Sequence, residues 1–562
     1  MPNRVAPSLL AFALAAFAAQ VSAEKIDHPR DCRAGSDSSP TSLGADGWAA
    51  VDGRVTGGCG AEPARIFDVR TRAQLVDALT KGHANGAEKK LDHHSKIIYV
   101  HGTIDLNVDD ANVALIEEDY MRMCAYAAHA TFYGSGGFFE AYKAAYDPNL
   151  WIKQSLDPAD NRPPALTGPL EAARLCFQRK QAERVMIDVG ANTSIIGAGP
   201  DARIKNGGLR IGFMNQNDAN DPQNYRAENV VIRNITFSDA FDMFPSWDPK
   251  DSFSIAITGS GGCQAVFENE SVGPHKCVFR GGRWNTEYDS IQVMNAAAVW
   301  IDHNSFSDEP RFDTQFPPVF AAPFNEATQK VAHHDGHVDV TLLATKVTIS
   351  NNYFQRHDKG NLLGGNDIAG LVPGYGPGQI DVTFHGNYYQ NMIQRMPRVR
   401  FGRVHVYNNV FDMDRNANAE YRLGDTWATG TAAKLVTENN LFEIRNNNLT
   451  IPRIINYAST VANRDICVSA GFTAAECGTY YSDKGTWITM RTTTTSATTL
   501  FNAFAAVKAI QESSSSNAPL MDASVFWLPS ETYDYSLAPV VTPDERAALR
   551  NRVVSGAGAG KL

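Results

Sequence analysis

Long hydrophobic runs are almost absent from this sequence of 562 residues. The one clear apolar run, Leu9–Ala19, is shorter than the ~20 residues that a membrane-spanning helix requires. A small residue, Ala23, follows it at a position typical of signal-peptide cleavage. We therefore expect a signal peptide over residues 1–23 and no membrane partner. The mature chain, residues 24–562, is expected to be one elaborated domain that is secreted and extracellular.

Basic residues are also in short supply, with 51 lysines and arginines against 61 aspartates and glutamates and a net charge of -10. This balance argues against general nucleic-acid binding, which needs a basic face. The charge balance is reversed in the stretch Val382–Phe411, which contains no acidic residue. Four arginines lie within it, Arg395, Arg398, Arg400 and Arg403. Such a patch could hold an anionic substrate on an otherwise acidic protein.

The Cys-x-x-Cys pattern is missing, which argues against a zinc site built from cysteines. Eight cysteines are present, and an even number in an exported chain indicates disulfides. Sequence leaves their connectivity open. Sequential neighbours are the simplest pairing: Cys32 with Cys59, Cys124 with Cys176, Cys263 with Cys277, and Cys467 with Cys477. Short spacing and loop-like surroundings favour the last two pairs most.

A repeat is the strongest positive signal. Six segments begin with Val or Leu, end with Phe or Tyr and alternate in hydrophobicity, as half-buried strands do: Val230–Phe237, Val299–Phe306, Val347–Phe354, Val382–Tyr389, Val404–Phe411 and Leu435–Phe442. Five of them share an asparagine in one column: Asn304, Asn352, Asn387, Asn409 and Asn440. Asparagine tolerates tight turns and can hydrogen-bond to a copy of itself one layer away.

The spacing between the repeats is uneven, at 69, 48, 35, 22 and 31 residues. A closed propeller would need steadier spacing, whereas a parallel β-helix tolerates long insertions at the edge of its coils. The sequence therefore predicts an all-β protein built as a parallel β-helix. A β-sandwich with Asn-rich turns stays open as an alternative, although it explains the asparagine column poorly.

Helical signals lie outside the repeat. The segments 70–82 and 541–554 each carry a capping box at their start, with Thr71 and Thr542 as the caps. Residues 109–188 are predicted to be a mostly helical insertion. The tail, residues 451–562, loses the repeat and is predicted to form peripheral loops and a C-terminal helix.

Three carboxylates stand out as candidate metal ligands. Asp335 and Asp339 would lie ~13 Å apart on a straight strand, but a bend at Gly336 would bring them together. Asp289 sits on the preceding strand-like run, so a stacked coil could place it alongside. Three carboxylates suit Ca²⁺; carboxylates that only bind backbone N–H groups in turns are the alternative. Nearby histidines also leave a zinc site open: His333, His334 and His337.

Basic residues follow the three carboxylates in the next repeats of the sequence. Lys359 and Arg395 occupy similar distances past their strands, and Arg400 shares the alternation of the strand that follows. Stacked coils would gather them beside the acidic cluster, which predicts a site for a polyanion that carries carboxylates. A solvated charged edge that protects a sheet from aggregation is the alternative.

The motifs "WIDHNSF", "HHDGHVD", "HDKGNLLGG" and above all "QRMPRVRFGRVHVYNN" resemble those of extracellular pectate lyases, polysaccharide lyase family 1. The resemblance covers most of the mature chain and is weaker after Thr450. It implies a right-handed single-stranded parallel β-helix and calcium-dependent β-elimination of polygalacturonate (pectate). We expect the protein to be a monomer.

Site residues follow from the same resemblance. Asp289, Asp335 and Asp339 would bind Ca²⁺. Lys359 and Arg400 would bind substrate carboxylates, and Arg395 would be the catalytic base. Glu287, where some relatives carry an aspartate, is not counted among the ligands. An inactive polysaccharide-binding β-helix, a pectin lyase acting on methyl esters and a hydrolase are the competing functions.

Overall fold

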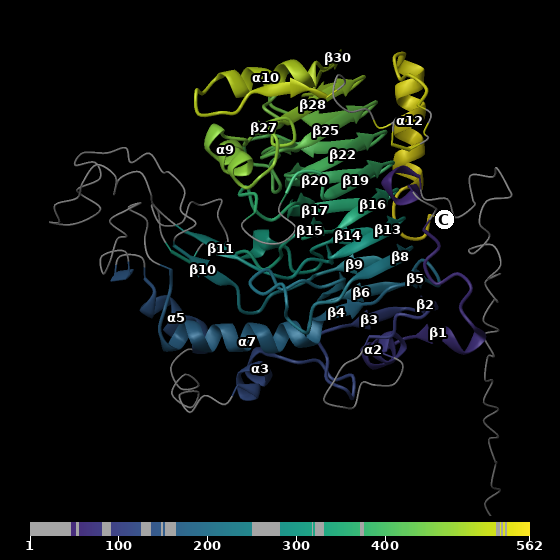
Figure 1. Cartoon of the computed structure of the whole chain (residues 1–562), viewed down its shortest axis with the longest axis vertical. Helices are drawn as coiled ribbons and strands as arrows, with labels where there is room; N and C mark the ends of the chain where they lie inside the picture. The colour runs from purple at the N-terminus through teal and green to yellow at the C-terminus, as the bar shows by residue number, and fades with distance from the viewer. Residues whose placement is uncertain are drawn as a thin grey trace, which may run out of the picture.

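The computed structural model describes most of the chain after residue 45 (Figure 1). The described residues are 46–51, 55–80, 91–124, 137–147, 150–151, 165–249, 282–316, 319–320, 331–370, 376–523, 529, 532–533, 535 and 537–561. The expected signal peptide and Cys32, Cys263 and Cys277 lie outside them. Among the described residues, no helix has both the length and the apolar character needed to cross a membrane.

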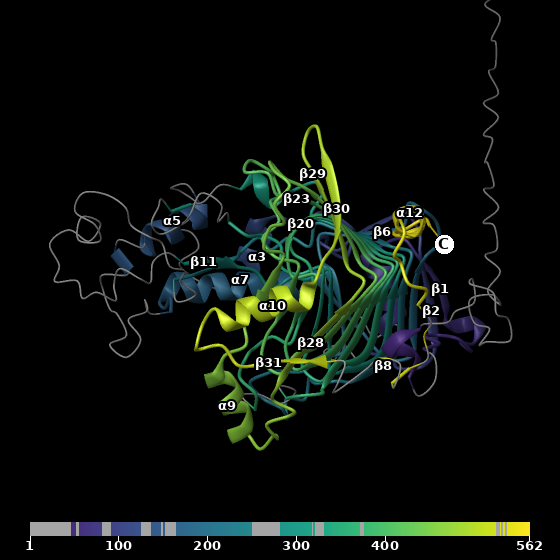
Figure 2. The same cartoon turned by 90° about the horizontal axis from the view of Figure 1, so that it is seen from above.

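Three long sheets run through the molecule, one strand per sheet in each coil (Figures 1 and 2). The widest has eleven parallel strands: β1 Ile66–Val69, β2 Lys96–Val100, β5 Thr193–Gly197, β8 Ala227–Arg233, β13 Ala296–Asp302, β16 Thr345–Ser350, β19 Ile380–His385, β22 Gly402–Tyr407, β25 Lys434–Glu438, β28 Thr479–Lys484 and β31 Leu520–Asp522. Each strand in it pairs with the equivalent strand of the next coil.

The second sheet has ten strands, of which only the last pairs antiparallel: β3 Thr103–Asp105, β6 Arg203–Lys205, β9 Thr236–Ser238, β14 Ser305–Ser307, β17 Tyr353–Lys359, β20 Tyr388–Gln394, β23 Val410–Asp414, β26 Leu441–Arg445, β29 Trp487–Arg491 and β30 Ser496–Leu500. The third has eight short parallel strands: β4 Met186–Val189, β7 Gly208–Ile211, β12 Ile291–Met294, β15 Val338–Thr341, β18 Leu362–Leu363, β21 Arg398–Val399, β24 Trp427–Thr429 and β27 Ile455–Tyr457.

This topology confirms the predicted parallel β-helix. From β12 to β29 the chain visits the eight-, eleven- and ten-stranded sheets in strict rotation. The interior is filled by one continuous apolar cluster that receives residues from all three sheets. The repeat ends in a buried aromatic stack, with ring centroids 4.5 to 5.3 Å apart, made of Phe237, Phe306, Phe354, Tyr389, Phe411 and Phe442.

The asparagine column forms a hydrogen-bonded ladder between the first two sheets. Each side-chain amide donates to the Oδ1 of the next at 3.0 to 3.1 Å, from Asn304 through Asn352, Asn387 and Asn409 to Asn440. All five side chains are fully buried. The residue before each one has a positive φ, which asparagine and glycine tolerate best: His303, Asn351, Gly386, Asn408 and Asn439.

Helices decorate the solenoid. Their bounds are α2 Arg72–Thr80, α3 Glu117–Met123, α5 Gly137–Ala145, α7 Pro169–Val185, α9 Val461–Ser469, α10 Ala503–Glu512 and α12 Pro543–Gly556, with short 3-10 turns η1 Gly47–Ala50, η2 Pro63–Arg65 and η5 Asp313–Gln315. The expected caps are present, because Thr71 accepts from the N–H of Gln74 and Thr542 from that of Glu545.

An arm of helices and a small antiparallel pair of strands projects from the early coils (Figure 1). It contains α3, α5, α7 and the antiparallel pair β10 Ser246–Asp248 and β11 Arg283–Asn285. The arm has an aromatic core of its own that includes Phe138, Phe177 and Trp247. A disulfide between Cys124 and Cys176 ties α7 to the end of α3.

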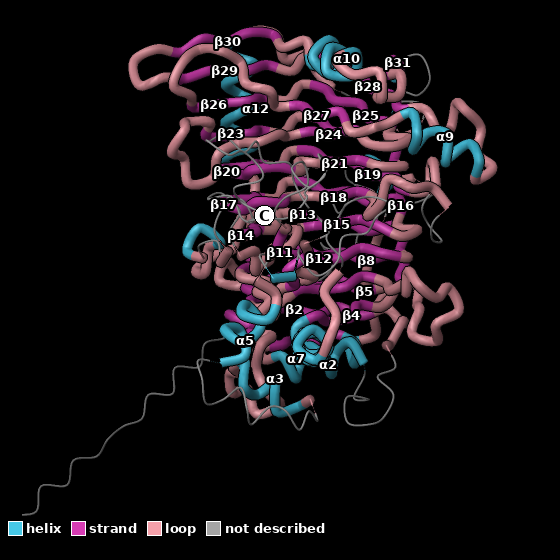
Figure 3. Tube along the Cα trace, turned by 90° about the vertical axis from the view of Figure 1, so that its left-hand side faces the viewer, coloured by secondary structure: helices cyan, strands magenta, loops and turns pink. Residues whose placement is uncertain are grey.

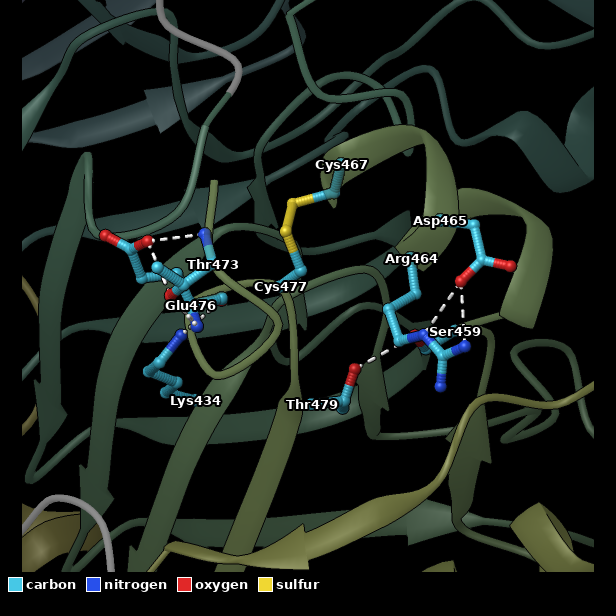
Figure 4. The surroundings of a disulfide bond; sticks show 9 residues. All are labelled: Lys434, Ser459, Arg464, Asp465, Cys467, Thr473, Glu476, Cys477 and Thr479. Carbon is cyan, nitrogen blue, oxygen red and sulfur yellow. Dashed lines mark hydrogen bonds and ion pairs between the residues drawn. A yellow bond between two sulfur atoms is a disulfide. The ribbon is translucent and has the colours of Figure 1, made fainter. Parts of the chain in front are cut away.

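Residues 451–562, expected as loops and a terminal helix, also contain strands. β27, β28 and β29 add a further coil, and β30 and β31 extend two of the sheets. The repeat motif is lost here, but alternation continues in short strands that pair with the coil below. A disulfide between Cys467 and Cys477 closes the loop after α9 (Figure 4), as its short spacing predicted.

The C-terminal segment runs back along the turns that carry the asparagine ladder. Asn439 donates from its amide to the carbonyl of Ala538 at 3.0 Å, before α12 begins. After α12, the N–H of Gly558 donates to the carbonyl of Asn351 at 2.8 Å, and that of Gly560 to Oδ1 of Asn234 at 2.6 Å. The segment therefore touches coils that are far apart in the stack.

Candidate active site

Three aspartates converge beside Gly336, at the start of strands β12 and β15 in the eight-stranded sheet. The N–H of Gly336 donates to Oδ1 of Asp289 at 2.6 Å. A Cβ added at Gly336 would overlap the carboxylate of Asp339 and come within 2.8 Å of Oδ1 of Asp289. A side chain at Gly336 would therefore displace these carboxylates, and the pairing of β12 with β15 on the next coil brings Asp289 alongside Asp339. We call Asp289, Asp335 and Asp339 the acidic cluster.

The acidic cluster has more negative charge than its surroundings neutralise. Burial, with repulsion from Asp339 and Asp335, holds the pKa of Asp289 well above its usual range. Burial and repulsion from Asp335 raise the pKa of Asp339 to about 7, although Arg395 and Lys359 oppose the shift. Two of the three side chains are almost fully buried, Asp289 at 4% and Asp339 at 8% exposed. Such a group binds a cation favourably.

Lys359 is the nearest base to the cluster. Its Nζ lies 2.5 Å from Oδ1 of Asp335, and Gly336 and Lys359 form a backbone bridge between neighbouring coils. Burial alone would lower the pKa of Lys359, but the carboxylate of Asp335 raises it. Lys359 is therefore held as an ammonium directly beside the acidic cluster.

Arg395 lies one coil further along, in the turn after β20. Its backbone has φ 62°, a left-handed conformation that a non-glycine residue adopts only where its surroundings fix it. The N–H of Asn361 donates to its carbonyl at 2.5 Å. Gly360 passes so close that an added Cβ would lie 2.7 Å from the same carbonyl. The Nε of Arg395 is buried and makes no hydrogen bond with any residue that the structure describes.

Arg398 and Arg400 continue the row of bases along β21. Arg400 is largely buried: its Nε lies 2.9 Å from Oδ2 of Asp367 and its Nη1 donates to the carbonyl of Gly364 at 2.8 Å. Arg398 has a more exposed side chain, 3.9 Å from the same carboxylate. Burial and repulsion from Arg400 lower the pKa of Arg398 to about 10.

The eight-stranded sheet thus brings together acids and bases that are far apart in the sequence. Figure 3 shows its strands β15, β18 and β21 side by side on the face turned to the viewer. Asp335 and Arg395 lie two coils apart at the same edge of this sheet, and Lys359 lies on the coil between them. Lys359 pairs with Asp335, and its strand β17 lies in register with β20.

A family model described as "Pectate lyase" matches residues 250–562, which is more than half of the chain. The chain belongs to the pectate lyase family. As a pectate lyase it is an enzyme that acts on polysaccharides as a lyase.

Individual relatives agree with the family match. The pectate lyase of Bacillus subtilis (strain 168) is 33% identical over 399 residues, which cover 71% of this chain and 75% of that protein. A solved pectate lyase from Acidovorax avenae subsp citrulli is 34% identical, with a TM-score of 0.74, over 94% of this chain and 99% of that one. A structure described as a pectate lyase bound to hexasaccharide is 30% identical, with a TM-score of 0.63, over 92% and 98%.

Among the described residues, the histidines for which the sequence left a zinc site open do not gather into one group of possible ligands. His333 stacks on Phe241 with centroids 4.3 Å apart. His334 bonds to Asp239 and Asp313 instead, at 2.9 and 2.8 Å. In the part of the chain that the structure describes, the compact groups of possible metal ligands are Asp308 with His337 and His357, and Asp308 with Asp313 and His334.

Sequence reasoning missed two carboxylates in this pectate lyase site. Asp367 pairs with Arg400, and Asp425 accepts a hydrogen bond from the backbone N–H of Arg395 and from Nδ2 of Asn456 at 3.0 Å. Both lie in connections outside the repeat segments. The Asn366-Asp367 pair has the composition of a turn, and only the fold places it opposite an arginine.

Proposed function

We propose that this protein cleaves (1→4)-α-D-galacturonan by calcium-dependent β-elimination and releases unsaturated oligogalacturonates. One observation carries the proposal: an acidic cluster short of positive charge lies beside a row of arginines on one sheet. A polymer of sugar acids has carboxylates for those arginines, and a bound cation would satisfy the cluster and the substrate together. The relative described as bound to hexasaccharide supports a saccharide substrate.

Calcium fits the residues present. The donors are carboxylate oxygens alone, which hard cations prefer, and Asp289 and Asp339 converge at Gly336. Asp289, Asp335 and Asp339 would hold the ion. Calcium bound there would supply positive charge that stabilises an anion next to a uronate carboxylate.

The remaining chemistry is assigned to side chains of the site. Arg395 would take the proton from C5 of the uronate through a guanidine nitrogen. The electron pair of the C5–H bond would form the C4–C5 double bond as the C4–O bond breaks. The departing oxygen would then take a proton from water, and the hydroxide left behind would remove the proton that Arg395 had gained.

Substrate carboxylates would be held by Lys359 and Arg400. Lys359 would exchange Asp335 for a sugar carboxylate when substrate binds. Arg400 is anchored by Asp367, so its remaining N–H groups point in a fixed direction, which favours bidentate binding of a carboxylate. Arg398, which is more exposed than Arg400, would also bind carboxylates of the substrate.

Secretion belongs to the same proposal. The disulfides Cys124–Cys176 and Cys467–Cys477 support folding in an oxidising compartment. We expect the mature enzyme, residues 24–562, to act outside the cell as a monomer on pectate.

The test uses purified mature protein and polygalacturonate. Ultraviolet absorbance of unsaturated products should rise with calcium and stop with a chelator. Arg395→Ala should abolish the rise. Arg403→Ala is the matched control from the same arginine-rich segment, because Arg403 pairs with Asp381 at 2.8 and 2.9 Å within the eleven-stranded sheet. New reducing ends without ultraviolet absorbance would mean hydrolysis and would overturn the proposal.

A further inference from the structure

A second polar groove lies far along the solenoid from the acidic cluster. Its volume is about 610 Å³, and it is bounded by β26, the β29–β30 hairpin and helix α12. Figure 3 places this hairpin at the C-terminal end of the stack. The strands belong to the ten-stranded sheet, whereas the acidic cluster adjoins the eight-stranded one. The active site described above therefore contributes no residue to it.

Positive charge exceeds negative charge in this groove, although the whole chain is acidic. Three arginines line it, Arg491, Arg546 and Arg550, against one carboxylate, Glu443. Nη2 of Arg491 and Nε of Arg550 share the same oxygen of Glu443, at 3.0 and 2.8 Å. A guanidinium has five N–H donors, so this single shared oxygen leaves most of them available.

The arginines are also held in place. Arg546 donates from Nη1 to the carbonyl of Val541 at 2.6 Å and covers the ring of Trp487 at 4.0 Å. Glu443, which anchors the other two, is only 9% exposed. The side chain of Arg491 is 49% exposed, so its guanidinium faces the groove and solvent. Fixed guanidinium groups bind carboxylates at a lower entropic cost than free ones.

Hydroxyl groups line the hairpin side of the groove, which also carries Arg491, across from Arg546 and Arg550 of α12. The hairpin contributes Thr489, Thr492, Thr494, Thr495, Ser496 and Thr498 to the lining. Strand β30 is exposed along its whole length. Thr489 and Thr498 pair across the hairpin at 2.9 Å, and each hydroxyl keeps further capacity to donate or accept. Hydroxyls that face arginines match a ligand that carries both hydroxyl and carboxylate groups.

We propose that this groove is a second binding site for an acidic oligosaccharide, recognised through its uronate carboxylates by Arg491 and Arg546 and through its hydroxyls by the threonine wall. Its identification with the polymer that the enzyme cleaves rests on the proposed function. The site would keep the enzyme on its polymer while the distant active site works. Its location on another sheet means that both sites can be filled at once.

Calorimetric titration of the Arg395→Ala protein with a defined oligogalacturonate counts the sites. We expect two sites per chain, and one after Arg491→Gln and Arg546→Gln are added. Retention of the otherwise intact enzyme on a pectate gel should weaken about tenfold with the same two changes, while its rate on short soluble substrate stays unchanged. Arg464→Gln, in an exposed pair with Asp465 on α9, is the matched control and should change neither result.

A second variant guards against a folding defect. Thr494→Glu places a negative charge on the exposed hairpin wall and should weaken retention without affecting thermal unfolding. An unchanged number of sites in the double variant would overturn the proposal. Retention on neutral galactan as strong as that on pectate would also overturn it. So would displacement of the enzyme by inorganic phosphate as effective as displacement by oligogalacturonate. If the proposed function were wrong but this site real, the titration would fall from one site to none.

Discussion

Buried aspartates occur in two neighbouring clusters that are balanced in opposite ways. In the acidic cluster, repulsion and burial raise the pKa of Asp289 and Asp339. In what we call the paired cluster, each aspartate has a cationic partner: Asp239, Asp308 and Asp313 with His334, His357 and Arg311. His334 and Asp335 are adjacent in sequence, yet they belong to different clusters.

The paired cluster shows what complete neutralisation looks like in this fold. His357 Nδ1 lies 2.7 and 2.8 Å from the two oxygens of Asp308. Although burial opposes it, the charge of Asp308 raises the pKa of His357, and Asp308 and Asp313 raise that of His334 well above its usual range. The difference separates carboxylates whose charge is neutralised by neighbouring side chains from carboxylates whose charge is not. The aspartates and histidines of the paired cluster are residue types that often bind metals, and they lie close together. They already bind one another.

The largest effect should come from removing one charge of the acidic cluster. Asp339→Asn should lower lyase activity at least about 100-fold, because loss of even an outer-shell partner of a metal costs up to that much. In chelator the same variant should melt at a higher temperature than the parent, since repulsion with Asp289 and Asp335 is relieved. Initial rates and melting curves with and without calcium test both. A lower melting temperature in chelator would show that the cluster is already neutralised.

The paired cluster should respond in stability instead. Asp308→Asn would leave His357 without its carboxylate, and breaking a buried pair costs about 3 kcal/mol or more in unfolding free energy. Urea unfolding followed by tryptophan fluorescence measures the change. Asp465→Asn, in an exposed pair with Arg464, is the control and should cost well under about 1 kcal/mol. Equal losses in the two variants would remove the distinction between the clusters.

A neutral buried network sharpens the comparison further. Asn387→Ala would leave the N–H of Asn352 without the acceptor that lies 2.9 Å away, and would interrupt the ladder. An unpaired buried group costs about 1–3 kcal/mol. The loss should be the same with calcium or chelator, because no charge is involved. The unfolding free energy of this variant is compared with that of Asn447→Ala, a control at an exposed site. A loss of stability that depends on calcium would contradict the prediction.

The smallest effect concerns pH. Asp483 has hydroxyl partners, including Thr437 at 2.6 Å, and burial raises its pKa to about 6. The folded protein therefore binds this proton more tightly than the unfolded chain. Its charged form lowers stability above pH 6, and this cost disappears as the pH falls through 6 toward the ordinary value near 4. Asp483→Asn should melt a little above the parent at pH 8 and level with it at pH 4. Equal differences at both pH values would contradict the assignment.

The sequence predicted the coils well because one repeat encodes them. Three features of the repeat each mark a fixed position in a coil: the hydrophobic alternation, the aromatic residue at the end of each segment and the asparagine column. Because equivalent residues stack in adjacent coils, these positions predict how the coils pair. The coil after Thr450 was missed because its segments keep the strand alternation without the asparagine. Its strands form because the coil below offers an edge to pair with.

The sequence offered candidate site residues only where they sit next to the repeat. Asp289, Asp335, Asp339, Lys359, Arg395 and Arg400 have fixed positions relative to repeat strands, and the structure gathers them on adjoining coils. Partners such as Asp367 and Asp425 lie in connections whose length varies from coil to coil. The repeat pattern of the sequence does not predict their positions, so only the structure shows which arginine each of them contacts.

The returning C-terminal segment changes how such a stack can come apart. In a solenoid each coil touches only its neighbours, so unfolding can begin at one end and spread. Here the stretch from Ala538 to Gly560 joins the turn of Asn439 to that of Asn234, across several intervening coils. Separation of the later coils would therefore also disturb the contacts that the tail makes at the turns of Asn351 and Asn234, so we expect the tail to couple the unfolding of coils that are far apart in the stack.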